Sequence, residues 1–246
     1  MVVREMRVSI IVPAFNEEKL IAASLHCMQQ AVRSFVQLGW ETEIVVCDNN
    51  SSDATAALAR AGGARVVFEP VNQIARARHT GATAALGDWF VFVDADSHPS
   101  PELFADVAAQ ISSGQCLGGG CTVRLDERIF VADCITYVWN CLSRLTKWAA
   151  GAFIFCEAEA YRQIGGFSME LFAAEEIDLS KRLKTLARAS GKKMVILHDH
   201  PLLTSARKVH LLTTADKVGL LTGSLFRGRQ MVRSREACSP WYDGRR

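Results

Sequence analysis

Short apolar runs alternate with segments of helical periodicity through the first hundred residues. From the apolar runs we predict buried strands at 8–12, 43–47, 65–68 and 89–93. From apolar residues at helical spacing we predict helices over 17–38, 54–61 and 74–86. Strands that alternate with helices are typical of an α/β fold, in which right-handed crossovers build a mostly parallel central sheet flanked by helices.

Polar residues directly follow three of these strands. Glu17 comes after the first strand, Asp48 after the second, and Asp94 and Asp96 after the fourth. In open sheets of this kind, ligands bind outside the carboxyl ends of the strands. We therefore expect these four side chains to lie together at a ligand site.

The second half of the chain has a less regular pattern. We predict strands at 117–125, 151–155 and 194–197, and helices over 97–111, 129–148, 158–164 and 179–189. Because no composition break marks a linker, residues 1–225 are predicted to form a single domain, followed by a basic C-terminal tail over 226–246. The absence of an apolar run of about 18 residues argues against a transmembrane helix, and no signal peptide is predicted.

Composition narrows the class of protein. Hydrophobic residues make up 49% of the chain, enough for a packed core, and the net charge of +2 does not indicate nucleic acid as a partner. The eight cysteines include no CxxC pair, and most lie in apolar runs. Buried, reduced thiols in a cytoplasmic protein are the favoured interpretation, and a zinc site is the weaker alternative.

Asp94 and Asp96 are the most informative pair. Two carboxylates one residue apart after an apolar strand suit a hard divalent cation such as Mg²⁺ or Mn²⁺, with a polar surface turn as the alternative. Such a metal also binds phosphate oxygens, and it would stabilise a nucleotide-diphosphate leaving group. His200, in the His-Asp-His run after a predicted strand, is a candidate further ligand, although a loop histidine without a role is equally consistent.

Glu175, Glu176 and Asp178 form a second acidic cluster, just before a predicted helix. Inverting sugar transfer needs a base that takes the proton of the acceptor hydroxyl as it attacks. A neighbouring carboxylate raises the pKa of such a base, which helps it to act near neutral pH. The alternative is that these acids only favour the N-terminus of the following helix.

Basic side chains are candidates for phosphate binding. Arg78 could reach donor phosphates or the acids of the donor site, or it could be a solvated helix arginine. Ser205, Arg207 and Lys208 combine a hydroxyl with cations, which suits a diphosphate or an acceptor phosphate. The tail arginines could contact anionic lipid headgroups, as in a peripheral protein at the inner face of a membrane, and a solvated tail is the alternative.

Several motifs, in this order along the chain, resemble those of family 2 glycosyltransferases, which have the GT-A fold, a Rossmann-like α/β fold. Residues 8–18 (VSIIVPAFNEE) are similar to the opening motif, and 46–55 (VCDNNSSDAT) to the second. Residues 77–88 and the acid triplet 94–96 continue the family order. On the acceptor side, 151–167 and 175–179 are similar to the G-G-F and E-D-x-D-L motifs. The resemblance covers roughly residues 7–210.

The resemblance implies a donor half at about 1–100 and an acceptor half at about 101–225. It implies that the nucleotide is bound by Pro13, Ala14, Glu17, Asp48, Arg78 and Asp94. Asp96 would hold the metal, and Glu176 would be the catalytic base, with Asp178 as the alternative base. The chain departs from the family pattern at Asn49, which replaces the second acid of a D-D pair, and at Glu176, where an aspartate is usual.

The implied activity moves a sugar from a UDP- or GDP-sugar, with inversion, to a saccharide, lipid-linked or small-molecule acceptor in cell-envelope glycan biosynthesis. Two other classes stay open, because a fold does not fix a function. A sugar-phosphate nucleotidyltransferase usually has a glycine-rich loop after the first strand, and residues 13–17 contain no glycine. A non-catalytic nucleotide-sugar binding module would not need the acid triplet or the second acidic cluster, and both are present.

Overall fold

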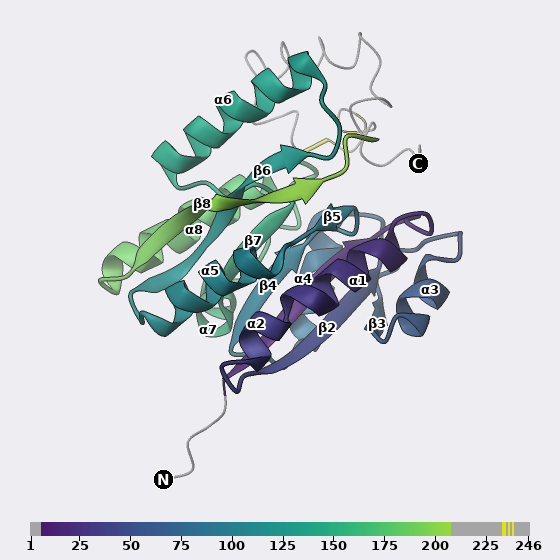
Figure 1. Ribbon diagram of the computed structural model, residues 1–246, viewed down its shortest axis with the longest axis horizontal. Coiled ribbons are helices and arrows are strands. Elements are labelled where there is room, and N and C mark those ends of the chain that lie inside the picture. Colours follow the sequence, from purple (N-terminus) through teal and green to yellow (C-terminus); the bar gives the residue numbers. More distant parts are fainter. Residues whose placement is uncertain (1–5, 208–232, 235, 237, 239–246) are drawn as a thin grey trace.

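The computed structural model describes residues 6–207 and positions 233, 234, 236 and 238 (Figure 1). The strands are β1 (Arg7–Ala14), β2 (Glu41–Asp48), β3 (Arg65–Phe68), β4 (Trp89–Val93), β5 (Ser97–His98), β6 (Cys116–Leu125), β7 (Phe153–Glu157) and β8 (Lys193–Thr204). The helices are α1 (Ile21–Ala31), α2 (Arg33–Val36), α3 (Thr55–Ala61), α4 (Ile74–Ala84), α5 (Pro101–Ser112), α6 (Phe130–Thr146), α7 (Ala158–Gln163) and α8 (Glu175–Ala189). Lys208 and nearly all of the predicted tail over 226–246 lie outside the described residues.

The strands form one sheet in the order β3-β2-β1-β4-β7-β6-β8-β5. The first four strands in this order are parallel to one another. Beyond β4 the sheet is mixed, because β7 is antiparallel to both of its neighbours and β5 is antiparallel to β8, whereas β6 and β8 are parallel. The predicted α/β class is confirmed, and the wholly parallel part is the half of the chain with the regular sequence pattern.

From Ile10 to Ala14 strand β1 is apolar and buried, because helices cover both faces of the sheet (Figure 1). Successive side chains in a strand point to opposite faces. Ile10 and Val12 accordingly belong to a core cluster that includes residues of α1 and α5. Ile11 belongs to a second cluster, on the other face, together with residues of α4, α7 and α8. Both clusters are completely enclosed, so β1 and β4 form a rigid base for the residues that follow them.

Helix α4 packs unusually close to β1, and a glycine makes this possible. A Cβ atom on Gly81 would lie 2.6 Å from Cγ2 of Ile11, well inside van der Waals contact. Only glycine therefore permits this approach. One turn earlier on the same helix is Arg78, whose side chain is thereby held against the sheet.

Several predicted boundaries in the second half were wrong. Residues 97–98 form the short strand β5 rather than the start of a helix. Helix α8 begins at Glu175, four residues earlier than predicted, so the acidic cluster lies in its first turn. The predicted helix over 17–38 is divided at Val32 into α1 and α2.

Strand β8 shows why the sequence pattern misled. Its pairing with β6 jumps from Cys121–Leu197 to Val123–Leu202, so that four residues of β8 stand opposite one residue of β6. This irregular stretch, 198–201, is polar, exposed and ends on a proline, features that usually mark a loop. The prediction that His200 follows a strand was therefore wrong. The residue lies within the bulged strand β8. Within the described residues, every helix is too short or too polar to cross a membrane.

Candidate active site

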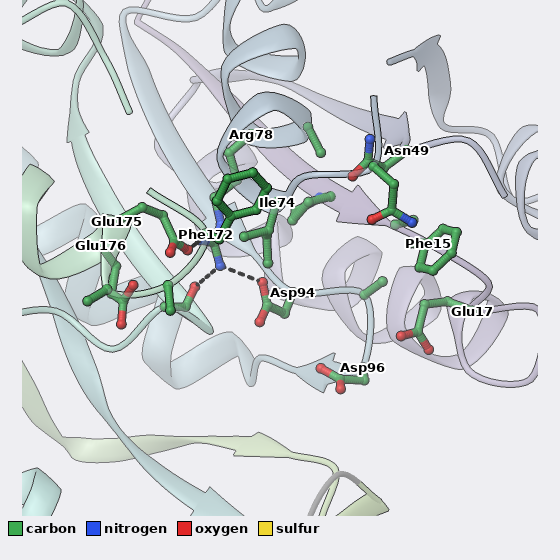
Figure 2. Close-up of a pocket in the computed structure, with 18 residues that line it drawn as sticks. Phe15, Glu17, Asn49, Ile74, Arg78, Asp94, Asp96, Phe172, Glu175 and Glu176 are labelled. Carbon is green, nitrogen blue, oxygen red and sulfur yellow. Dashed lines mark hydrogen bonds and ion pairs between the residues drawn. The ribbon is translucent and has the colours of Figure 1, made fainter. Parts of the chain in front are cut away.

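A pocket of about 240 Å³ opens at the carboxyl ends of β1 and β4 and beside the start of α8. Its lining comprises Pro13, Ala14, Phe15, Glu17, Asn49, Asn72, Ile74, Ala77, Arg78, Asp94, Ala95, Asp96, Gly151, Phe172, Ala173, Ala174, Glu175 and Glu176 (Figure 2). The residues come from both halves of the chain. The pocket therefore brings the acids that follow β4 to the same cavity as the acids that begin α8.

Arg78 lies between these two groups of acids (Figure 2). Its Nη2 donates a hydrogen bond to Oδ1 of Asp94 at 2.9 Å, and its Nη1 donates to Oε1 of Glu175 at 2.5 Å. Nη2 also donates to the carbonyl oxygen of Gly151 at 2.7 Å. The Arg78 residue is only 1% exposed, so the alternative of a solvated helix arginine was wrong.

Burial alone would lower the pKa of Arg78, but the charges of Asp94 and Glu175 outweigh it and the pKa is raised. The guanidinium is therefore charged at any ordinary pH. Gly151 accepts its hydrogen bond in the loop before β7, where a Cβ atom would lie 3.4 Å from Nη2 of Arg78, in ordinary van der Waals contact. The arginine thus joins α4, the loop before β7 and the first turn of α8.

The first turn of α8 is set by a residue in an unusual backbone conformation. Ala174, the N-cap, has a φ of 60°, in the left-handed region that costs a non-glycine residue about 1–3 kcal/mol. The turn at Ala174 directs both Glu175 and Glu176 to the pocket. Backbone strain of this kind persists where the surrounding contacts fix it, and here the ion pair between Arg78 and Glu175 is such a contact.

Glu176 is an acid of the pocket whose pKa is strongly shifted. Burial first, and then the negative charge of Glu175, raise the pKa of Glu176 to about 8. Glu175 is engaged by Arg78, whereas no described side chain donates a charged hydrogen bond to the carboxylate of Glu176. A carboxylate with this pKa can hold or release a proton near neutral pH, as a general base requires.

A second arginine, just outside the pocket lining, contacts two of the pocket's acids. Nη2 of Arg207, just after β8, lies 2.8 Å from each carboxylate oxygen of Glu17 and 3.8 Å from Oδ2 of Asp96. The Nε and Nη1 atoms of Arg207 are buried and have no hydrogen-bond partner among the described residues. Asp96 is itself 3% exposed, and its carbonyl oxygen accepts a hydrogen bond from the backbone of Ser205.

This corner of the pocket fits a divalent cation. The carboxylates of Glu17 and Asp96 already share a positive group, the guanidinium of Arg207, which shows that the corner concentrates negative charge. Within residues 6–207 and the four later positions, no cluster of three or more acidic, histidine or cysteine side chains could hold a metal by itself. Mg²⁺ and Mn²⁺ are commonly held by one or two carboxylates together with substrate phosphates, and this donor set matches that requirement.

The comparison with known proteins agrees with this geometry. A family model described as Glycosyl transferase family 2 matches residues 9–149, more than half of the chain. The chain belongs to this family. The matched region includes β1 to β4 and the acids that follow them, but it ends before α8.

Two bacterial proteins are relatives of this family 2 glycosyltransferase. The chain is 31% identical over 113 residues to an uncharacterized glycosyltransferase of Mycobacterium tuberculosis, a match that covers 46% of this chain and 47% of that protein. It is 34% identical over 125 residues to the undecaprenyl-phosphate 4-deoxy-4-formamido-L-arabinose transferase of Pseudomonas fluorescens, covering 48% of this chain and 35% of that protein. The matches thus span about half, or less, of the length of these relatives.

A solved structure confirms the GT-A fold of the glycosyltransferase. The mannosyltransferase of Pyrobaculum calidifontis, solved in complex with GDP-Man and Mn²⁺, aligns with a TM-score of 0.64 over 98% of this chain and 74% of that one. The sequence identity is 18%, so the likeness establishes the fold alone.

Most of the residues predicted for this glycosyltransferase line its pocket. Those found there are Pro13, Ala14, Glu17, Arg78, Asp94, Asp96, Glu175 and Glu176. Asp48 is buried beside the pocket, where its Oδ1 accepts a hydrogen bond from the backbone of Ser51 in the turn before α3. Asn49, which follows Asp48, lines the pocket instead.

Four further predicted residues lie outside the pocket lining, and the first of them, Arg207, contacts the lining residues Glu17 and Asp96. Asp178 is outside the pocket lining and pairs with Arg182 at 2.7 Å. His200 lies on β8, with its Nδ1 2.8 Å from Oδ2 of Asp106 on α5. Ser205 accepts a hydrogen bond from the backbone of Arg207 and does not line the pocket.

Other pocket residues of the glycosyltransferase were not singled out from the sequence. Phe15, Ile74 and Phe172 give the pocket an apolar wall, and Gly151 provides a carbonyl oxygen to Arg78. Apolar residues in apolar surroundings carry no chemical signal in one sequence. Gly151 did carry a detectable signal, because it opens the segment 151–167 that was matched to an acceptor-side motif.

Proposed function

We propose that the protein transfers a sugar, with inversion at the anomeric carbon, from a nucleotide-diphosphate donor to a hydroxyl or phosphate of an acceptor. One observation carries this proposal. The acids that follow β4, Asp94 and Asp96, open to the same pocket as Glu176, whose pKa is raised to about 8. A site for a charged diphosphate and a base for an acceptor are therefore adjacent.

The donor would bind across the carboxyl ends of the strands. Pro13 and Ala14 at the end of β1 offer a flat apolar surface for the nucleotide, and Asp94 offers a carboxylate to a sugar or ribose hydroxyl. The Pyrobaculum mannosyltransferase was solved in complex with GDP-Man and Mn²⁺, which supports the same class of donor here. Binding of UDP compared with GDP would distinguish a uracil nucleotide from a guanine nucleotide as the donor.

A divalent cation, Mg²⁺ or Mn²⁺, would be held by Asp96 with help from Asp94 or Glu17, and it would neutralise the charge that develops on the departing diphosphate. This assignment agrees with the negative charge concentrated at that corner. It does not require His200, whose imidazole is occupied by Asp106.

Arg207 would change partners when the donor binds. In the structure it neutralises Glu17, while two of its nitrogen atoms lack hydrogen-bond partners among the described residues. A diphosphate would satisfy those donors, because the planar guanidinium matches phosphate oxygens in bidentate geometry. Arg207 is thus the residue of the predicted phosphate group, Ser205, Arg207 and Lys208, that the pocket geometry favours.

Glu176 would act as the base. As the acceptor oxygen attacks the anomeric carbon, its proton passes to the carboxylate of Glu176, and the bond between the anomeric carbon and the diphosphate oxygen breaks with its electron pair leaving on the diphosphate. Arg78 does not touch the reacting atoms in this scheme. By binding Asp94 and Glu175 it holds the donor side and the base side at a fixed separation, as efficient catalysis requires.

Calorimetric binding of UDP and GDP, each with and without Mn²⁺, tests the donor site. We expect one nucleotide to bind the native protein in a metal-dependent manner and the Asp96→Ala variant to lose that dependence, at a cost of several kcal/mol. Asp106→Ala is the matched control, since Asp106 lies outside the pocket on α5. Failure of the native protein to bind either nucleotide would overturn the proposal.

A further inference from the structure

Helix α6 exposes its large apolar side chains, whereas a normal surface helix buries them. Its buried positions are small or polar, with Ala132 and Ser143 as the two fully buried residues. The side chain of Asn140 donates to the carbonyl oxygen of Val123 at 2.9 Å and accepts from the Val123 backbone nitrogen at 3.0 Å, and so attaches the helix to the edge of β6. Polar contacts therefore hold α6 on the domain, whereas surface helices usually bury their apolar stripe.

The outward face of α6 is apolar. Seven of the twelve strongly exposed large apolar side chains in the described residues lie on this one helix: Phe130 (82%), Val131 (66%), Ile135 (58%), Tyr137 (71%), Val138 (65%), Leu142 (41%) and Leu145 (82%). Figure 1 shows α6 standing at the margin of the molecule, beyond β6 and β8. A continuous apolar surface of this kind on a soluble domain marks an interaction site.

The C-terminal end of this face is surrounded by cations. Arg144 is in the last turn of α6, and Lys147 directly follows that helix. Lys181 of α8 places its Nζ 4.7 Å from the ring centre of Trp148. Lys184, one turn along α8, donates to the carbonyl oxygen of Thr146 at 2.7 Å. The chain contains no acidic residue between positions 133 and 157, so the segment that supplies Arg144 and Lys147 is basic.

We propose that the outward face of α6 docks on an anionic lipid surface. An apolar helix face with aromatic residues and a cationic border is the arrangement that inserts into the boundary between headgroups and acyl chains, where anionic lipids neutralise the basic side chains. A second copy of α6 is a poorer match. Its one acid, Asp133, is already paired with Arg128 at 3.0 Å and offers no free carboxylate to these cations.

The docking face is connected directly to the pocket. Five residues after α6 ends, the carbonyl oxygen of Gly151 receives the hydrogen bond of Arg78, and the backbone of Ala149 donates to Oγ of Ser180 on α8. Docking through α6 would therefore place the acceptor side of the pocket near the lipid surface. A lipid-linked acceptor follows only if the proposed function also holds, whereas the docking itself does not depend on it.

Vesicle co-sedimentation with matched variants tests the proposal. The full chain is expected to bind vesicles of phosphatidylglycerol and phosphatidylcholine more tightly than vesicles of phosphatidylcholine alone, and to release them at high salt. The V138E/L145E variant should lose about tenfold or more of that affinity, because two apolar contacts become charged. The V36E/L38E variant makes the same two substitutions on exposed residues near the end of α2 and should keep it.

Unchanged binding by V138E/L145E, or equal loss in both variants, would overturn the proposal. Thermal unfolding shows that each variant is folded, and calorimetric nucleotide binding gives an independent reading. A protein that binds vesicles but neither UDP nor GDP would refute the proposed function and leave the docking intact. A protein that binds a nucleotide but no anionic vesicles would refute the docking alone.

The cysteines of α6 provide a direct probe. Cys134 and Cys141 are exposed on this helix, whereas the other described cysteines are buried or partly buried. An environment-sensitive fluorophore on these thiols should show a blue shift when anionic vesicles are added. Slow labelling and a blue-shifted spectrum before any vesicles are present would show that another protein surface already covers the face. Sedimentation velocity would then distinguish a second copy from the chain's own residues, and either result overturns the proposal.

Discussion

The two halves of the pocket hold their acids in different ways. On the donor side, Asp94 and Asp96 follow the fully buried strand β4, so the parallel sheet itself fixes their position. On the acceptor side, Glu175 and Glu176 begin a helix after a left-handed alanine, and the contact with Arg78 fixes the position of Glu175. The backbone of a parallel sheet can thus position one half of a site, while the other half depends on specific ion pairs.

Arg78 is where the two halves meet. It belongs to α4 in the donor half, and it contacts Asp94 in that half and both Glu175 and Gly151 in the other. Burying three charged groups costs desolvation energy that the mutual attraction must offset. The arrangement is therefore intolerant of the loss of any one partner.

Glu176→Gln should separate the two halves functionally. Glutamine has nearly the same shape but cannot accept the acceptor's proton, so we expect kcat for sugar transfer to fall by about 10²–10⁴-fold. Binding of the nucleotide with Mn²⁺, measured by calorimetry, should be unchanged because the donor site is intact. Asp178→Gln serves as the control, since Asp178 pairs with Arg182 outside the pocket. Transfer at the native rate by Glu176→Gln would eliminate this residue as the base.

Arg78→Met should break the connection between the halves. It leaves Asp94 and Glu175 close together without their shared cation, and we expect the free energy of unfolding to fall by about 3–5 kcal/mol. Urea denaturation measures this change. Arg76→Met makes the same substitution two residues earlier on α4, where the arginine donates to Oε1 of the neutral Gln73, and should cost far less. Equal losses in the two variants would show that the buried ion pairs of Arg78 contribute no particular stability to the fold.

The sequence predicted the donor half well because two independent patterns agree there. Apolar strands buried on both faces give continuous hydrophobic runs, and the polar residues that follow them gather at one edge of the sheet. The strand at 89–93 was predicted with its observed limits, and both acids after it line the pocket. The prediction that Asp48 binds the nucleotide base stays untested. In the structure its carboxylate accepts a hydrogen bond from the Ser51 backbone.

The acceptor half was less predictable for a physical reason. Its strands belong to the mixed part of the sheet, and β8 contains an exposed polar bulge that resembles a loop in sequence. The partnership of Arg78 with Glu175 joins residues 97 positions apart, and no local pattern encodes such a contact. The acidic cluster itself was found, but its place within the first turn of α8 required the structure.

A pH profile should sharpen the contrast between the halves. Burial and the charge of Glu175 raise the pKa of Glu176 to about 8, and a base must be deprotonated to act. We therefore expect kcat/KM to rise about tenfold per pH unit below that value and to level off above it. Nucleotide binding should show no matching transition. A profile that is flat from pH 6 to 9 would contradict the assignment of Glu176.

The smallest expected effect concerns a residue that belongs to neither half of the pocket. His200 is on the bulged part of β8, where the hydrogen bond to Asp106 raises the pKa of its imidazole. A protonated imidazole cannot bind a metal, and the side chain does not line the pocket. We therefore expect His200→Ala to leave Mn²⁺ affinity, measured by calorimetry in the presence of the bound nucleotide, unchanged. Asp96→Asn is the positive control, and a loss of about 10–100-fold in the histidine variant would place His200 among the groups that hold or orient the metal.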